Sequence, residues 1–154
     1  MKKLGFIIAA AVFSFNILNA QQLNDKGLYL TSEGELFSGV ITSHVDNVKS
    51  KITVKEGVIA GEAEYFYASG KLMETGVFTE GKKDQKWTRF NENGTTSAIA
   101  FYTLGKKTGT WLVFDDAGKK RFEMNYNNGE KTGTWINWDE NGLVVNTKNY
   151  SITN

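Results

Sequence analysis

Short runs of alternating hydrophobic and polar residues cover most of the chain, and segments rich in Gly, Asn and Asp separate them. Residues 109–114 form one run of aromatic and β-branched residues, residues 115–118 form a turn, and residues 119–126 form a second run with apolar side chains at every second position. A period of two is typical of a β-strand with one buried face. The pattern therefore predicts a β-hairpin.

The hairpin pattern recurs every 24 residues from Gly57 to Tyr150. Tight turns require positive φ angles, which Gly, Asn and Asp tolerate. We therefore expect the recurrent glycines to close the turns between strands. These turn glycines are Gly57, Gly70, Gly81, Gly94, Gly105, Gly118, Gly129 and Gly142. A further series, Gly61, Gly109 and Gly133, is interrupted by Gln85.

Two strands and two turns fill each 24-residue unit, which leaves no room for a long helix. The predicted fold class is all-β: a repeat protein whose stacked hairpins form a single-layer antiparallel meander of roughly ten strands. In such a sheet each hairpin buries its aromatic residues mainly against its neighbours. We divide the chain into a lead-in or cap strand (21–38), a degenerate repeat (39–56) and four repeats (57–154), the last truncated.

Residues 1–20 resemble a secretory signal peptide. Met1, Lys2 and Lys3 form a basic start, residues 4–15 are mostly apolar, and Ala20 precedes two glutamines. The apolar run is shorter than the ~20 residues that a membrane span needs. We therefore expect cleavage near Ala20, export to the periplasm or the extracellular space, and no transmembrane segment in the mature chain.

Composition removes several classes of chemistry. The chain has no Cys and a single His, His44, which excludes disulfide scaffolds, thiolate zinc sites, thiol catalysis and sites with two imidazoles. Lys and Arg number 18 against 17 Asp and Glu, so no global field favours nucleic acid. Known catalytic motifs are missing from the sequence. We expect a non-enzymatic protein without cofactor or metal, in which His44 is a strand residue.

Carboxylates recur in three of the predicted turns, at 91–94, 115–118 and 139–142. Oxygen ligands of this kind can bind calcium. The alternating Asp spacing of a calcium loop is missing, however, and Asx turns explain the same residues. We therefore favour a turn-forming role for these carboxylates.

The repeat resembles a known family. The pattern Gly-x-Trp-x-x-Phe-x-x-x-Gly, followed by an aromatic residue and Gly-Lys-Lys-x-Gly, is similar to the MORN repeat, in particular to the MORN-repeat variant of many exported bacterial proteins. Residues 101–111 and 126–135 carry the resemblance best. It implies a repeat module for interaction, and some bacterial members are described as antitoxin-like proteins of the YwqK type. Ala63, Ser43 and Gln85 depart from the pattern.

Two sets of side chains are candidates for binding. Six aromatic residues could form a platform for a ligand, but their recurrence in every copy favours a structural core. They are Trp87, Phe90, Trp111, Phe114, Trp135 and Trp138. A basic row, Lys83, Lys107 and Lys131, could meet lipid head groups, acidic glycans or carboxylates of a partner. We expect these lysines in turns, where solvated charge is ordinary.

A third aromatic series, Phe78, Tyr102, Tyr126 and Tyr150, is predicted to form a further packing ladder. Together these features predict an exported, non-enzymatic repeat module that mediates protein–protein or cell-envelope interaction. Two alternatives remain open: an antitoxin or immunity protein of a toxin–antitoxin pair, and a binder of envelope polysaccharide or lipid. The expected partner is another protein or an envelope component and not nucleic acid, and contact with a membrane surface remains open.

Overall fold

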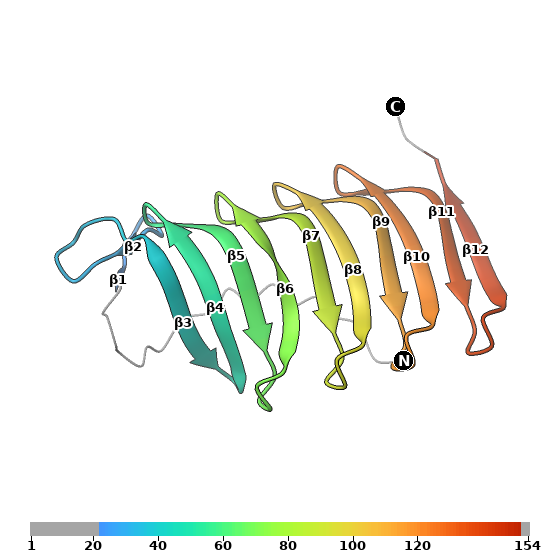
Figure 1. Cartoon of the computed structure of the whole chain (residues 1–154). Coiled ribbons are helices and arrows are strands. Elements are labelled where there is room, and N and C mark those ends of the chain that lie inside the picture. Colours follow the sequence, from blue (N-terminus) through green and yellow to red (C-terminus); the bar gives the residue numbers. More distant parts are fainter. Residues whose placement is uncertain (1–21, 152–154) are drawn as a thin grey trace.

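The structure, a computed structural model, describes residues 22–151 and contains twelve β-strands in that range. Strands β3 to β12 form one antiparallel sheet in which each strand pairs with the next one in sequence (Figure 1). The predicted single-layer meander is therefore confirmed. The ten strands are β3 (Gly39–Val45), β4 (Val48–Lys55), β5 (Val58–Phe66), β6 (Leu72–Thr79), β7 (Lys82–Phe90), β8 (Thr96–Thr103), β9 (Lys106–Phe114), β10 (Lys120–Asn127), β11 (Glu130–Trp138) and β12 (Val144–Tyr150).

The 24-residue period governs where the strands begin. Strands β5, β7, β9 and β11 begin at residues 58, 82, 106 and 130, and their partners β6, β8, β10 and β12 begin at 72, 96, 120 and 144. Strands β3 and β4 occupy the range assigned to the degenerate repeat. The predicted signal peptide, residues 1–20, lies outside the described residues.

The lead-in differs from a single cap strand. Strands β1 (Gln22–Leu23) and β2 (Tyr29–Leu30) pair with each other in a small sheet of their own at the β3 end of the molecule (Figure 1). Tyr29 is buried there with Ile41 of β3 and Val54 of β4, and Phe37 packs against this cluster. The lead-in thus covers the apolar side chains that the first hairpin would otherwise expose.

Two-residue turns join one hairpin to the next. In the β8–β9 turn, Leu104 and Gly105 have φ angles of 46° and 86°, as a type I′ turn requires. The N–H of Gly105 also donates a hydrogen bond of 2.7 Å to the carbonyl oxygen of Lys83, at the start of β7. Gly129 makes the same bond, of 2.8 Å, to Lys107. These turns therefore reverse the chain and also tie successive hairpins together.

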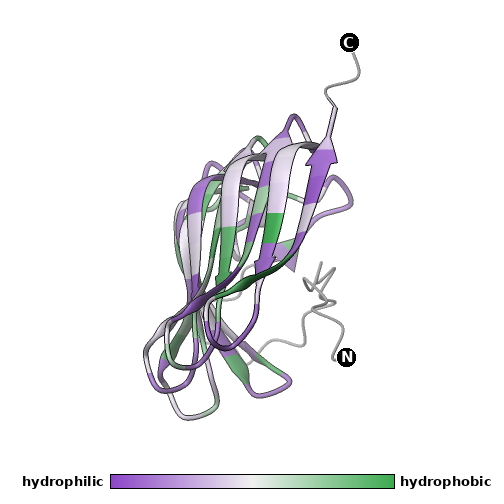
Figure 2. Ribbon diagram, turned by 90° about the vertical axis from the view of Figure 1, so that its right-hand side faces the viewer, coloured by the Kyte–Doolittle hydropathy of each residue, from purple (hydrophilic) through white to green (hydrophobic). Residues whose placement is uncertain are grey.

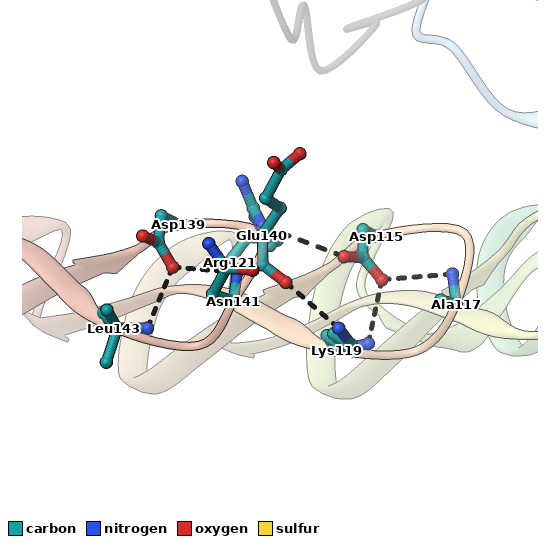
Figure 3. Close-up of polar contacts among 8 residues, drawn as sticks. All are labelled: Asp115, Ala117, Lys119, Arg121, Asp139, Glu140, Asn141 and Leu143. Carbon is teal, nitrogen blue, oxygen red and sulfur yellow. Dashed lines mark hydrogen bonds and ion pairs between the residues drawn. The ribbon is translucent and has the colours of Figure 1, made fainter.

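Five-residue loops close hairpins β5–β6, β7–β8, β9–β10 and β11–β12 at the opposite end of the strands, whereas Asp46 and Asn47 alone join β3 to β4. In two of these loops an aspartate forms an Asx turn. Oδ1 of Asp115 accepts hydrogen bonds from the backbone N–H groups of both Ala117 and Lys119, at 3.0 and 2.9 Å (Figure 3). Asp139 does the same in the next hairpin. Lys119 Nζ then donates to the carbonyl oxygen of Glu140, at 3.0 Å, which links the two turns. The recurrent carboxylates in these turns thus have a local structural role.

A β-bulge occurs at one recurring position where a hairpin meets its predecessor. The register shifts between β4 and β5, β6 and β7, β8 and β9, and β10 and β11. Each bulge contains a residue of the interrupted glycine series, all with positive φ: Gly61 at 112°, Gln85 at 58°, Gly109 at 62° and Gly133 at 59°. Gln85 therefore adopts the glycine conformation although it carries a side chain.

The sheet has two unlike faces. One face, here called the core face, carries Trp87, Trp111 and Trp135, and its buried cluster includes Ala63 and Ala100. We call the opposite face the outer face. Viewed from the side (Figure 2), the strands form one bowed layer in which hydrophobic and hydrophilic segments alternate along the strands. The molecule therefore buries its aromatic residues between neighbouring hairpins and not between two sheets.

Candidate functional site

The central feature of the core face is a stack of aromatic rings. The ring of Trp111 lies between those of Tyr102 and Tyr126, with centroid distances of 5.1 and 5.0 Å. The ring of Trp135 lies between Tyr126 and Tyr150, at 5.2 and 4.9 Å. The Trp series and the Phe/Tyr series, predicted as separate ladders, therefore interleave into one stack.

Each tryptophan of the stack is also fixed by a hydrogen bond. The indole Nε1–H groups of Trp87, Trp111 and Trp135 donate to backbone carbonyl oxygens ten residues earlier, at 3.1, 3.0 and 3.0 Å. Trp87 and Trp111 are only 1% and 2% exposed. Their position fits the structural role that the sequence favoured over a ligand platform, because a buried indole offers no surface to a ligand.

The other aromatic candidates lie on the outer face. Phe90, Phe114 and Trp138 each follow a stack tryptophan by three residues, and strand alternation points residues so spaced to opposite sides. Trp138 lies under Lys120, whose Nζ is 4.3 Å from the ring centroid. Both residues line a shallow depression of about 300 Å³, together with Lys119 and Gly142. The six aromatic candidates therefore do not form one platform.

The basic row lies on strands and not in turns. Lys83, Lys107 and Lys131 are the second residues of β7, β9 and β11. Each ammonium group lies over the tryptophan four residues later: the Nζ-to-centroid distances are 3.7 Å to Trp87, 4.5 Å to Trp111 and 4.6 Å to Trp135. The expectation of lysines in turns is wrong because the two-residue turns end at Gly81, Gly105 and Gly129, so each lysine, two residues after its glycine, already lies in a strand.

The lysines also contact the tyrosine side of the stack. Lys107 Nζ lies 4.9 Å from the ring centroid of Tyr126, and Lys131 Nζ lies 5.2 Å from that of Tyr150. A cation over the face of an aromatic ring is attracted by the quadrupole of the ring. Each of the last three hairpins therefore carries one cation above its own tryptophan and a neighbouring tyrosine.

Burial shifts the pKa values of these groups. Burial lowers the pKa of Lys83, although Glu74, 3.1 Å away, counteracts the shift by stabilising the charged amine. Burial also lowers the pKa of Lys107, and the positive charge of Lys131 lowers it further. Burial raises the pKa values of Tyr65 and Tyr102 to about 12, helped by the negative charge of Glu74. The stack is thus partly withdrawn from water.

Three further charged residues of the core face escaped the sequence analysis. Glu74 and Arg89 pair directly across β6 and β7, and Lys148 pairs with Trp135 across β12 and β11. Lys148 Nζ lies 5.1 Å from the ring centroid of Tyr150. Residue parity could have found Lys148, since it precedes Tyr150 by two residues and so shares its face.

Three further predictions concern His44, metal binding and membrane-spanning helices. His44 lies in β3 opposite Lys49. Within residues 22–151, no group of three His, Asp or Glu side chains is arranged to hold a metal ion. The same part of the chain contains no helix long and apolar enough to cross a membrane.

Comparison with known families matches the description "MORN repeat variant" to residues 60–80 and 107–128. The first match covers most of hairpin β5–β6, and the second covers β9–β10. The chain therefore contains MORN-variant repeats. One MORN repeat thus corresponds to one hairpin, and β7–β8 and β11–β12 repeat the same geometry between and after the matched segments. No curated protein matches the chain. These matches indicate a repeat module for interaction.

Proposed function

We propose that this MORN-repeat protein is an exported, non-enzymatic module that binds a macromolecular partner, either another protein or a component of the cell envelope. The observation that carries the proposal is the core face, where each of the last three hairpins holds one lysine over a fixed aromatic stack. Repeat proteins commonly use such extended surfaces for binding. Affinity would then come from several equivalent contacts along the sheet.

The shape of the molecule supports binding over catalysis. Enzyme sites need a concave pocket that excludes water and shifts the pKa values of an acid and a base. Here the depression around Trp138 is shallow, and packing in the stack explains the shifted pKa values of Lys83, Tyr102 and Lys107. Hydrogen bonds from loop and turn residues lower the pKa values of the Asp84 and Glu33 carboxyl groups. A single layer of strands offers a surface and not an enclosed pocket.

Export is supported by the basic and apolar pattern of residues 1–20. The absence of Cys is compatible with an oxidising compartment, because stability in a repeat protein is distributed over many neighbour contacts. A partner in the envelope or outside the cell therefore fits the proposal.

The proposal can be tested by cross-linking in intact cells that express the full chain with a C-terminal tag. We expect the tagged chain to begin near Gln21, to fractionate outside the cytoplasm and to cross-link to one partner. The double variant Lys107→Gln/Lys131→Gln should lose the cross-link. Lys106→Gln, on the outer face, serves as the matched control. An uncleaved cytoplasmic chain, or a cross-link unchanged in the double variant, would contradict the proposal.

A further inference from the structure

The charges of strands β9 to β12 are divided unequally between the two faces. Lys107, Lys131 and Lys148 lie on the core face. Each pairs across the sheet with a residue of the aromatic stack, namely Tyr102, Tyr126 and Trp135, respectively. The two acidic residues of these strands, Glu123 and Glu130, pair with Leu112 and Asn127 and therefore lie on the outer face. Across these four strands the core face thus carries three positive charges and no carboxylate.

The ammonium groups of this face are also held in place. Lys107 lies over Trp111 and Tyr126, and Lys131 over Trp135 and Tyr150, at distances between 4.5 and 5.2 Å. The charge of Lys131 makes the charged form of Lys107 less favourable. By contrast, Lys83 in the preceding hairpin has Glu74 at 3.1 Å. An anion placed between Lys107 and Lys131 would be attracted by both ammonium groups.

The spacing of the lysines restricts the kind of anion. Lys107 and Lys131 are two strands apart, which is about 10 Å at the usual strand separation. In an extended peptide, side chains on one side recur every ~7 Å, and residues about 10 Å apart point to opposite sides. An acidic peptide strand therefore fits poorly. A polysaccharide in which acidic and neutral sugars alternate has its carboxylates two rings apart, which is closer to this spacing.

The surface between the lysines suits sugar rings. Tyr126, Trp135 and Tyr150 are half-buried, so parts of their rings remain accessible between the ammonium groups. Aromatic side chains of this kind combine an apolar face with a polar tip that can hydrogen-bond. A sugar acid can place its ring on the aromatic surface while its carboxylate accepts hydrogen bonds from a lysine.

We propose that the core face of β9 to β12 binds an acidic polysaccharide in which charged and neutral sugars alternate, with successive carboxylates on Lys107 and Lys131. The chain of sugars runs across the strands, over Tyr126 and Tyr150. This inference rests on the proposed function, because it names the partner class of the same face.

Calorimetric titration of the full mature chain with hyaluronan oligosaccharides, which alternate acidic and neutral sugars, tests the inference. We expect saturable binding that weakens as salt is raised. Lys107→Gln and Lys131→Gln should each weaken binding about tenfold, the effect of losing one charge-assisted contact. Lys106→Gln should leave it unchanged. Lys131 is exposed, so its variant keeps the test valid if Lys107→Gln does not fold.

Two comparison probes decide between this ligand and other polyanions. Poly-L-glutamate tests an acidic peptide, and vesicles of phosphatidylglycerol test a lipid surface. Tighter binding of either probe than of hyaluronan would overturn the inference, and so would equal affinity of wild type and both lysine variants. If no oligosaccharide binds while the cellular cross-link persists and depends on Lys107 and Lys131, the inference is refuted and the proposed function stands.

Discussion

Gln85 adopts a backbone conformation that its side chain disfavours. Its φ of 58° falls in the left-handed region, as do those of Gly109 and Gly133 at the same place in other repeats. A side chain in this region costs roughly 1–2 kcal/mol because Cβ approaches the following carbonyl oxygen. The repeat therefore retains local strain at β7.

We expect Gln85→Gly to raise the free energy of unfolding by about 0.5–1 kcal/mol, since relief of strain outweighs the added freedom of the unfolded chain. Gly109→Gln should lower it by a similar amount, about 0.5–1 kcal/mol, for the converse reason. Urea titration followed by tryptophan fluorescence measures both. A destabilised Gln85→Gly would show that the glutamine side chain contributes contacts that exceed the strain.

Gly76 illustrates a constraint set by a neighbour and not by φ. A Cβ atom built on Gly76 would lie 2.3 Å from Cδ2 of the Trp87 indole, far inside van der Waals contact. Gly76→Ala should therefore destabilise the protein by ~1–3 kcal/mol through overpacking. In the background of Trp87→Ala the same substitution should be nearly neutral. Equal effects in both backgrounds, measured in a double-mutant cycle, would contradict the predicted clash.

Individual residues were predictable where the backbone alone decides them. Gly105 and Gly129 follow from the positive φ of a two-residue turn, and the sequence spacing is sufficient to place them. The placement of Lys107 over Trp111 follows from strand alternation once β9 is known to begin at Lys106, because residues four apart lie on one side of a strand; the expectation of this lysine in a turn missed it. The residue at which a strand begins therefore decides which side-chain contacts alternation predicts.

At the scale of the element, the side chains of internal hairpins are more deeply buried than those of the last hairpin. Trp111 in β9 is 2% exposed, whereas Trp135 in β11 is half-buried and Val144 to Asn149 of β12 are all exposed. Each internal hairpin has a neighbour on both sides, and β12 has one only on the β11 side among the described strands. Stability should therefore decrease toward the β12 end.

We expect Trp111→Ala to lower the free energy of unfolding by ~3–5 kcal/mol and Trp135→Ala to lower it by clearly less. The difference arises because the smaller side chain leaves a closed cavity in β9 and an open one in β11. Thermal unfolding followed by circular dichroism gives both values. An equal loss for the two variants would mean that the last hairpin is as tightly packed as the central ones.

The elements themselves were largely predictable, and the lead-in was not. Strand positions from β5 to β12 follow from the glycine and aromatic series, because every hairpin repeats the same turn chemistry. Residues 22–37 lie outside the period. Their pairing of Gln22 with Leu30 and of Leu23 with Tyr29 depends on packing against the first hairpin, which no local pattern specifies.

The whole molecule should lose stability in alkaline solution through its stack. Burial raises the pKa values of Tyr65 and Tyr102 to about 12, above the ordinary value of about 10. A raised pKa in the folded state contributes stability that is present below the unfolded-state pKa and is lost as pH rises through the folded-state pKa. The lowered pKa values of Lys83 and Lys107 act in the opposite sense, but only below the ordinary lysine pKa of 10.5.

The free energy of unfolding should therefore fall between about pH 10 and pH 12. Denaturant titrations across this range, with tyrosinate absorbance to follow ionisation, measure the effect. In the double variant Tyr65→Phe/Tyr102→Phe the fall should be much smaller, because neither site can ionise. A fall of the same size in this variant would assign the alkaline sensitivity to other groups.

The uniform junction between hairpins has a consequence for how this protein can change its length. Gly81 is followed by β7 and Gly105 by β9, through the same turn and the same hydrogen bond to the preceding hairpin. Removing residues 82–105 would join Gly81 to Lys106 and recreate a junction that already exists. Unequal recombination between such copies would therefore yield shorter or longer sheets that fold, and the number of binding units along the face could vary in whole steps.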